Sequence, residues 1–270
     1  MFATRMRPLR VCAGGAVVCC LYEGNFQHVA AASSVAASFY GLNIDGLEAA
    51  DTDLSVEALA RHHLRDLRAV QQQGPYCLFG YSFGGLVAYE MALQLTESGA
   101  SVGLLGLFDT PHPGFHAMLS PQELQVALRV YRADRARKYW TNLCTGRIDR
   151  LTRDALGYVG KKLRPLTWRA FRVAIRENPE ASRLLRTDAM WHAYRPRPFV
   201  GRMLLIRAQG RDAEFAGDPT MGWRKSALGG VDLLFAPGSH EVMMEAAHSS
   251  QLAGLLAPSI RALAPSRHVS

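Results

Sequence analysis

A serine stands between two glycines at the point where an apolar run gives way to a helical pattern. The segment reads Gly80-Tyr81-Ser82-Phe83-Gly84. The apolar run Tyr76 to Gly80 is typical of a buried strand, and a helix is predicted from Gly85 to Ser98. A sharp turn between a strand and a helix presents its serine hydroxyl at the carboxyl end of the sheet. We therefore predict that Ser82 is a nucleophile and not an incidental residue of a glycine-rich turn.

A nucleophilic serine needs a base that accepts its proton, and histidine suits this role near neutral pH. We expect that base late in the chain, after the last predicted strand, Val231 to Ala236, and His240 meets this condition. His248 lies eight residues further on, in or near a closing helix. Five other histidines fall in an amphipathic helix or beside a basic middle block: His62, His63, His112, His116 and His192. We predict that His240 is the general base.

A carboxylate must hold the imidazole in the correct tautomer, and two aspartates compete for this role. Asp109 ends the predicted strand Val102 to Phe108, which follows the helix after Ser82. Asp212 follows the predicted strand Met203 to Ala208. In folds that carry a serine turn of this kind, the acid usually lies at this position. Both keep the chain order Ser, Asp, His, and neighbouring parallel strands end on the same rim of a sheet. Spacing alone leaves both aspartates open.

The elements that must position these residues alternate between strand and helix. Two further strands are predicted at Ala16 to Leu21 and Phe39 to Leu42, and three further helices at Gln27 to Phe39, from Ser55 or the preceding aspartates to Gln73, and Ser250 to Leu263. This alternation predicts an α/β fold with a mostly parallel sheet covered by helices on both faces. The block Ser120 to Ala193 is helical and basic and interrupts the alternation. We therefore predict residues 1–119 and 194–270 as the core and residues 120–193 as an inserted helical lid.

The N-terminal segment has two interpretations. Arg5, Arg7 and Arg10 precede the apolar run Val11 to Leu21, a pattern that resembles a secretory signal. The alternative is a buried strand from Ala16 to Leu21, and we favour it because the following segments continue the fold without a break. The run is too short to cross a bilayer. We expect a cytoplasmic protein without a membrane partner.

Composition excludes several classes of protein. The chain has 270 residues and is 49% hydrophobic, enough to bury a core. Its five cysteines are too sparse for a disulfide scaffold and lack the spacing of a zinc site, so no metal is expected. The net charge of +8 is uneven: the block from Arg129 to Arg211 holds 21 Lys and Arg against 6 Asp and Glu, a net of +15. Because this block lacks a nucleic-acid-binding motif, we expect no nucleic-acid partner.

Several segments besides the serine turn carry distinctive combinations of residues. They are Gly74-Pro75-Tyr76, Val87-Ala88-Tyr89-Glu90-Met91-Ala92, Leu107-Phe108-Asp109-Thr110-Pro111, Tyr194-Arg195-Pro196-Arg197-Pro198, Asp218-Pro219-Thr220-x-Gly222-Trp223, and Gly238-x-His240 with Met243-Met244. From about residue 39 to its end, the chain closely resembles the thioesterase domains that end polyketide synthases and non-ribosomal peptide synthetases. These domains belong to the α/β-hydrolase superfamily.

The resemblance implies roles for particular residues. In that family the acid lies on the strand after the helix that follows the serine, which favours Asp109 and leaves Asp212 as the alternative acid. The family's oxyanion hole combines the amide after the nucleophile, here Phe83, with an amide of a loop after the first core strand. That loop usually reads His-x-Gly-Gly or Pro-x-x-Gly-Gly, and here it reads Tyr22-Glu23-Gly24-Asn25. The implied second donor is the amide of Glu23 or Gly24.

The resemblance also implies a reaction. An acyl, polyketide or peptidyl chain passes from the phosphopantetheine arm of a carrier protein to Ser82 and is released by water or by an internal nucleophile. No cofactor is expected, since the substrate arrives on the partner's phosphopantetheine. Two rivals remain: a carboxylesterase of small free esters, and a catalytically degenerate protein that only binds a carrier. The basic block then either docks an acidic carrier protein or is a solvated outer face of the lid.

Overall fold

The computed structural model describes residues 6–43, 55–144, 179–211, 215 and 217–263. The chain divides into two compact units. The first comprises Met1–Met118 and Met190–Ser270, and the second comprises Leu119–Ala189. The residues whose side chains we discuss as a candidate site all belong to the first unit.

The first unit contains a seven-stranded sheet with the order β1-β3-β2-β4-β5-β6-β7. The strands are β1 (Arg7–Arg10), β2 (Ala16–Leu21), β3 (Ala37–Leu42), β4 (Tyr76–Tyr81), β5 (Val102–Phe108), β6 (Met203–Ala208) and β7 (Val231–Ala236). Only the pairing of β1 with β3 is antiparallel, and the others are parallel. The carboxyl ends of six strands therefore meet along one rim.

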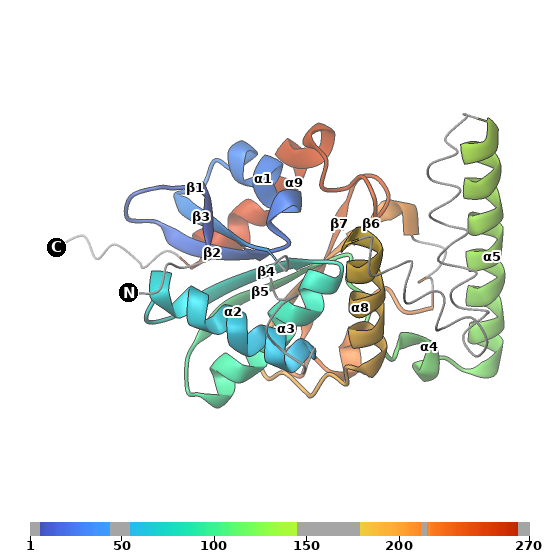
Figure 1. Ribbon diagram of the computed structural model, residues 1–270, viewed down its shortest axis with the longest axis horizontal. Helices are drawn as coiled ribbons and strands as arrows, with labels where there is room; N and C mark the ends of the chain where they lie inside the picture. Colours follow the sequence, from blue (N-terminus) through green and yellow to red (C-terminus); the bar gives the residue numbers. More distant parts are fainter. Residues whose placement is uncertain (1–5, 44–54, 145–178, 212–214, 216, 264–270) are drawn as a thin grey trace. The chain divides into compact units, whose positions relative to one another are not determined.

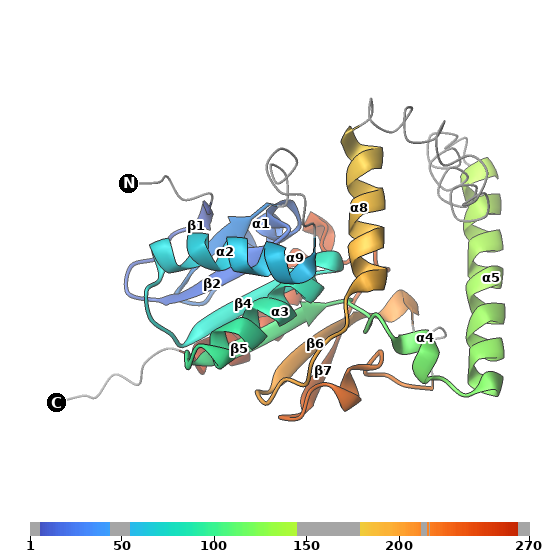
Figure 2. The ribbon, with the colours of Figure 1, turned by 60° about the horizontal axis from the view of Figure 1, so that its bottom comes forward.

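Helices cover both faces of this sheet (Figure 1). In the first unit they are α1 (Glu23–Ala32), α2 (Val56–Val70), α3 (Phe83–Glu97), the short α4 (Phe115–Met118) and α9 (Ala246–Arg261). Two 3-10 turns, η1 (Gln209–Arg211) and η2 (Trp223–Lys225), flank the loop between β6 and β7. Helices α1 and α9 pack together on one face, while α2 and α3 pack together on the other. Figure 2 shows α3 along β4 and β5, which it contacts.

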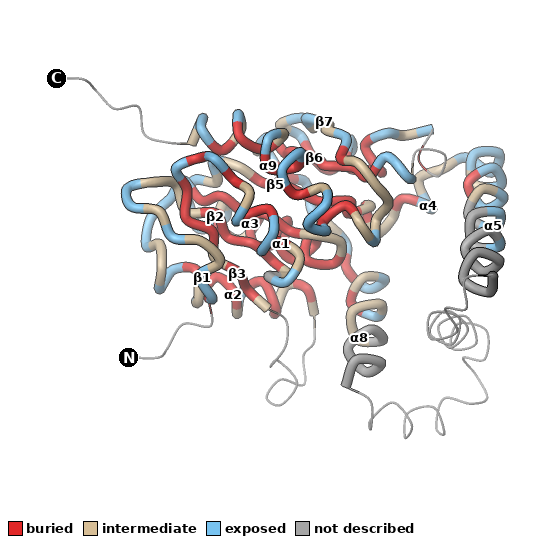
Figure 3. The backbone as a smooth tube through the Cα atoms, turned by 90° about the horizontal axis from the view of Figure 1, so that it is seen from above, coloured by how far each residue is buried: buried red, intermediate tan, exposed pale blue. Residues whose placement is uncertain are grey.

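Burial explains why the apolar runs become strands. The central strands are covered on both faces and are therefore nearly continuous in apolar residues. Figure 3 shows them as the buried centre of the unit. In α2 the pattern is amphipathic instead, and its inward residues are Val56, Leu59, Ala60, His63, Leu64 and Leu67. Ser55 caps α2 by accepting a hydrogen bond of 3.1 Å from the amide of Ala58.

The N-terminal region confirms the sequence prediction in one place and departs from it in two. The buried strand is present, because β2 pairs with β3 and β4 in the middle of the sheet. The helix predicted from Gln27 to Phe39 was wrong at both ends: α1 begins at Glu23, and β3 begins at Ala37. The ladders that β3 forms with β1 and β2 outweigh the weak helical preference of this Ala- and Ser-rich segment. Sequence reasoning also missed β1.

The second unit contains α5 (Pro121–Cys144) and most of α8 (Pro179–Ala193). The start of α5 is a capping box, in which Ser120 Oγ accepts from the Glu123 amide and Glu123 Oε2 accepts from the Ser120 amide. Residues 119–189 hold 16 Lys and Arg against 7 Asp and Glu, a net of +9. Five arginines counted in the block from Arg129 to Arg211 belong to the first unit: Arg195, Arg197, Arg202, Arg207 and Arg211. The role of this unit as a lid stays a prediction.

Candidate active site

The serine turn is built from residues that tolerate very close approach. Ser82 joins β4 to α3 with φ 53° and ψ −121°, a conformation that costs a non-glycine residue about 1–3 kcal/mol. A Cβ added to Gly80 would lie 2.2 Å from the carbonyl oxygen of Gly84. One added to Gly84 would lie 2.8 Å from the carbonyl oxygen of Leu21. The glycines two residues before and after Ser82 are therefore required by the turn and by the neighbouring strand end.

Strand β5 holds the backbone of Ser82 in this conformation. The Ser82 amide donates to the carbonyl of Phe108 at 2.9 Å, and the Ser82 carbonyl accepts from Thr110 Oγ1 at 3.0 Å. Thr110 also lies against the first turn of α3, since a Cβ added to Gly85 would lie 2.0 Å from Thr110 Oγ1. Sequence reasoning did not single out Thr110 as a site residue. Its position directly after Asp109 was the available signal.

Asp109 and His240 meet across the rim of the sheet. Asp109 directly follows β5 and His240 lies in the loop after β7; they are 131 residues apart in the chain, and His240 Nδ1 lies 2.6 Å from Asp109 Oδ2. Asp109 Oδ1 accepts from the amide of Ala208 at 3.0 Å. Gly238 precedes His240 in this loop with φ 85°, and a Cβ added to it would lie 3.1 Å from His248 Nε2 of α9. The structure therefore brings together the acid and base that sequence reasoning proposed.

The electrostatic environment keeps Asp109 ionised. Its side chain is fully buried, and burial alone would raise the pKa of the carboxyl. The hydrogen bond from His240, the charge of Arg211 and the amide of Ala208 act in the opposite direction and lower the pKa below its ordinary value. An ionised carboxylate only accepts hydrogen bonds, so Nδ1 of His240 is the protonated nitrogen of this contact. The other ring nitrogen, Nε2, is then an acceptor in the neutral imidazole.

Tyr81, the last residue of β4, contacts both the ring and the backbone of His240. The two rings stack with centroids 5.0 Å apart and planes 20° apart. The Tyr81 hydroxyl also donates a hydrogen bond to the carbonyl of His240. Burial is the main cause of the raised pKa of Tyr81, so its hydroxyl stays protonated and remains a donor. This contact, between residues 159 apart, could not be found from sequence spacing.

Two helix starts lie at neighbouring strand ends beside Ser82. The register of β2 and β4 pairs Leu21 with Gly80, and α1 and α3 begin two to three residues later. Tyr22 makes the turn into α1 with φ 71°, and its ring packs edge-on to Phe83 with centroids 6.4 Å apart. The first amides of a helix lack intrahelical acceptors and carry its positive dipole. The amide of Phe83 thus lies at the start of α3, and the amides of Glu23 and Gly24 lie at the start of the neighbouring α1.

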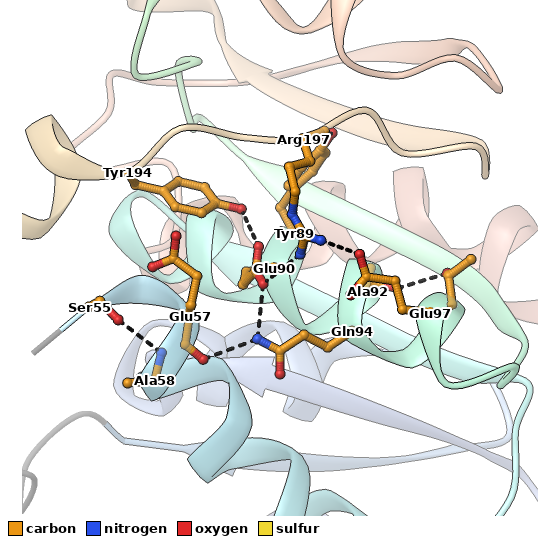
Figure 4. A network of polar contacts seen from close by, with 11 residues as sticks. Ser55, Glu57, Ala58, Tyr89, Glu90, Ala92, Gln94, Glu97, Tyr194 and Arg197 are labelled. Atoms are coloured by element: carbon orange, nitrogen blue, oxygen red, sulfur yellow. Dashed lines mark hydrogen bonds and ion pairs between the residues drawn. The ribbon is translucent and has the colours of Figure 1, made fainter. Parts of the chain in front are cut away.

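A polar network centred on the buried Glu90 anchors α3 (Figure 4). Glu90 accepts hydrogen bonds from Tyr194 at 2.8 Å, Gln94 at 2.9 Å and Arg197 at 3.1 Å. Arg197 also pairs with Glu97 near the end of α3. The network ties the helix that begins at the serine turn to the segment that follows α8.

The remaining candidates lie elsewhere or outside the described residues. His62 and His63 are in α2, His116 is in α4, His192 is in α8 and His248 is in α9. His112 is buried, with its ring bonded to Ser226 and to the Gly114 amide and packed against Trp223. The alternative acid Asp212 lies outside the described residues. Among the residues that are described, no three His, Cys, Asp or Glu side chains form a group that could hold a metal.

These features define a class of protein. A mostly parallel sheet, helices on both faces and a serine on a strained turn between strand and helix together constitute the α/β-hydrolase fold. The family model described as Thioesterase domain matches residues 22–260, and the chain belongs to that family. Membership implies a hydrolase. None of the described helices has the length and apolarity needed to cross a membrane.

Solved structures share this fold. The chain is 21% identical to the NocB thioesterase domain, solved as a covalent complex with a fluorophosphonate nocardicin G analog. The TM-score is 0.61, and the match covers 92% of this chain and 96% of that one. A four-domain nonribosomal peptide synthetase, holo-AB3403, is 20% identical with a TM-score of 0.65, over 94% of this chain and 20% of that one. At this level of identity the likeness concerns the fold alone.

Curated relatives are much longer proteins. Malpinin synthetase of Mortierella alpina is 44% identical over 73 residues, which are 27% of this chain and 1% of the synthetase. Indigoidine synthase of Streptomyces lavendulae is 34% identical over 97 residues, 36% of this chain and 8% of the synthase. Polyketide synthase PksR of Bacillus subtilis (strain 168) is 35% identical over 75 residues, 27% of this chain and 3% of the synthase. The chain thus spans only a small part of the length of these relatives.

Proposed function

We propose that this protein releases an acyl, polyketide or peptidyl chain from the phosphopantetheine thioester of a carrier protein, with Ser82, His240 and Asp109 as its catalytic triad. The observation that carries the proposal is the 2.6 Å contact of His240 Nδ1 with the buried, ionised carboxylate of Asp109, at strand ends on the same rim of the sheet as the serine turn. The names of the relatives and neighbours, which include polyketide synthases and peptide synthetases, support the substrate class.

The first step forms an acyl-enzyme. His240 Nε2 takes the proton of Ser82 Oγ while Oγ bonds to the thioester carbonyl carbon. The tetrahedral intermediate then collapses, the carbon–sulfur bond breaks, and the proton passes from Nε2 to the departing pantetheine thiolate. Asp109 stays ionised throughout and stabilises the imidazolium that forms between these two events.

The oxyanion of each intermediate is held by backbone amides. The amide of Phe83 at the start of α3 is one donor, and the amide of Glu23 or Gly24 at the start of α1 is the other. A Cβ added to Gly24 would meet no heavy atom of the described chain within 4 Å, so this position has open space beside it. One such donor is worth about 3 kcal/mol in the transition state.

The second step releases the product. A water molecule gives its proton to His240 Nε2 as its oxygen bonds to the acyl carbon, and the ester bond to Ser82 Oγ breaks as Oγ regains that proton. A hydroxyl or amine of the acyl chain replaces water in a cyclisation. The proposal covers both outcomes because they use the same protein groups.

A labelling experiment tests the triad. A fluorophosphonate probe should add one label to the wild-type chain, detected by intact mass, and none to Ser82→Ala. The His240→Gln variant should react far more slowly, although it keeps the serine. Labelling that persists in Ser82→Ala would exclude Ser82 as the nucleophile. Absence of labelling in the folded wild type would instead favour the degenerate, carrier-binding alternative.

Substrate comparison tests the thioesterase assignment. The wild type should cleave acyl-pantetheine thioesters with higher kcat/KM than the matched oxyesters, and an acyl group should be trapped on Ser82 and identified by mass. Equal or greater activity on the small oxyesters, with no release from a carrier-bound thioester, would favour a carboxylesterase.

A further inference from the structure

The loop after β6 places an arginine against the acid of the proposed triad. Arg211 Nη1 lies 3.1 Å from Asp109 Oδ2, the same oxygen that contacts His240 Nδ1. In the sequence this loop offers Asp212 as an alternative acid, and the preceding residue, Arg211, was not predicted to belong to the site. The structure shows that Arg211 contacts Asp109.

The strand order explains how the three side chains meet. Asp109 follows β5, Arg211 ends the 3-10 turn after β6, and His240 follows β7, and these are consecutive strands of the sheet. The 3-10 turn also contacts the histidine loop directly. The amide of Gly210 donates to the carbonyl of Gly238 at 2.9 Å, and a Cβ at Gly210 would lie 3.1 Å from Ser239 Cα. The turn that ends at Arg211 is therefore tied by its backbone to the loop that carries His240, while the Arg211 side chain reaches Asp109.

Aromatic packing removes part of the solvent around the arginine. The guanidinium carbon of Arg211 lies 4.9 Å from the centre of the Phe215 ring, and Phe215 is buried. Arg207 lies 5.9 Å from the centre of the same ring. The Arg211 side chain is 21% exposed. A partly desolvated cation acts more strongly on Asp109 than an exposed arginine would.

We propose that Arg211 is a positioning residue that, through Asp109, keeps His240 in its neutral, base-competent form at lower pH. This inference rests on the proposed function. The carboxylate of Asp109 favours a proton on the imidazole, whereas the arginine on the same oxygen offsets part of that negative charge. Arg211 also orients the carboxylate toward Nδ1. Among the described residues, the other charged or titratable groups around the pair include Tyr81 of β4, which stays neutral, and Glu241, which follows His240. They also include His248 of α9, beside Gly238, and Arg207, which lies by the same Phe215 ring as Arg211.

The test compares Arg211→Gln with Arg211→Lys. The glutamine variant removes the charge, and the acidic limb of its kcat/KM profile on an acyl-pantetheine thioester should move to higher pH by about one unit. The lysine variant keeps the charge and should stay close to the wild type. Arg202→Gln is the matched control, because Arg202 pairs with the half-exposed Asp232 away from the site, and its profile should match the wild type.

A second readout does not depend on turnover. In Ser82→Ala protein with 13C-labelled histidine, the Cε1 signal that disappears in His240→Gln reports the titration of His240. Its midpoint should rise by about one unit when Arg211→Gln is added and should not rise with Arg211→Lys. If the wild type proves inactive but this midpoint moves as expected, the proposed function fails, while the effect of Arg211 on His240 is confirmed. An unchanged midpoint in folded Arg211→Gln protein, or an equal change in the lysine variant, would overturn the inference.

Discussion

Thr110 Oγ1 donates a hydrogen bond of 3.0 Å to the carbonyl oxygen of Ser82 and so joins the residue after the proposed acid to the proposed nucleophile. Thr110 Oγ1 also lies 3.2 Å from the carbonyl oxygen of Phe108. Three of the four non-glycine residues with positive φ in the described chain, Tyr22, Ser82 and Asp109, belong to this region. The contacts of Thr110 are therefore part of what maintains backbone strain at the rim of the sheet.

Replacing Thr110 by valine should reduce activity more than stability. The change keeps the shape but removes a donor, and the free energy of unfolding should fall by about 1 kcal/mol. We expect kcat/KM to fall by about tenfold because Ser82 loses a restraint on its position. Thr96→Val is the control: Thr96 donates to Ala92 within α3, and its loss should leave kcat/KM unchanged. Equal activity losses in both variants would argue against a positioning role for Thr110.

Gly85→Ala should destabilise the protein strongly. The new Cβ would lie 2.0 Å from Thr110 Oγ1, so either α3 or the Thr110 segment must move, at a cost of about 1–3 kcal/mol. Gly254→Ala in α9 meets no described atom within 4 Å and should stabilise the protein by up to about 1 kcal/mol. Urea unfolding measures both changes. Adding Thr110→Ala to Gly85→Ala should recover part of the loss, and strict additivity would contradict the proposed clash.

The two glutamates that share Arg197 should differ in energetic weight. Glu90 is almost fully buried and also accepts from Tyr194 and Gln94, so Glu90→Gln should lower the free energy of unfolding by about 1–3 kcal/mol. Glu97 is 54% exposed, and Glu97→Gln should cost less than about 1 kcal/mol. Chemical denaturation of the two variants provides the comparison. A larger loss for Glu97 would refute this ranking.

Burial of His112 predicts a pH dependence of stability. Burial lowers the pKa of His112 from 6.5 to about 4. Between these two pH values the imidazole is therefore mostly protonated in the unfolded chain and mostly neutral in the folded chain. The free energy of unfolding should therefore fall as the pH drops from about 6.5 to about 4, by on the order of 3 kcal/mol for this group. Urea titrations across this range measure the slope.

Two variants separate the contribution of His112 from that of other groups. His112→Gln removes the titrating ring and should flatten the dependence between pH 6.5 and 4, whatever its effect on overall stability. His116→Gln changes an exposed histidine of α4 and should leave the slope as it is in the wild type. A wild-type slope in the His112 variant would show that another group is responsible.

Salt should distinguish a docked carrier protein from a small substrate. The second unit carries a net of +9, and an acidic carrier attracted to it would lose affinity as ions screen the charges. Between about 0.05 and about 0.5 M salt, kcat/KM for the carrier-bound thioester should fall by about tenfold. The acyl-pantetheine thioester, which lacks the carrier, should show little change. The same dependence for both substrates would leave the basic unit as a solvated surface.

Much of the core could be predicted from the sequence because buried parallel strands are continuous apolar runs. Strands β2, β5, β6 and β7 begin and end where the sequence predicts. The serine turn was also predictable, since its glycines lie beside Ser82 in the chain and the strain they relieve is local. The chain order of Ser82, Asp109 and His240 follows from the succession of strand ends. Their catalytic roles stay predictions.

The tertiary structure decided the contacts between residues far apart in the chain. The pairing of Arg211 with Asp109 and the hydrogen bond of Tyr81 to His240 join residues 102 and 159 positions apart. Such a contact cannot be predicted from the periodicity of the sequence, because it depends on which strands are neighbours and on how their loops turn. The same holds for β3, whose pairing partners outweigh its local preference. Sequence alone thus determined most of the elements and the serine turn, while packing at the rim of the sheet decided which charges surround the proposed base.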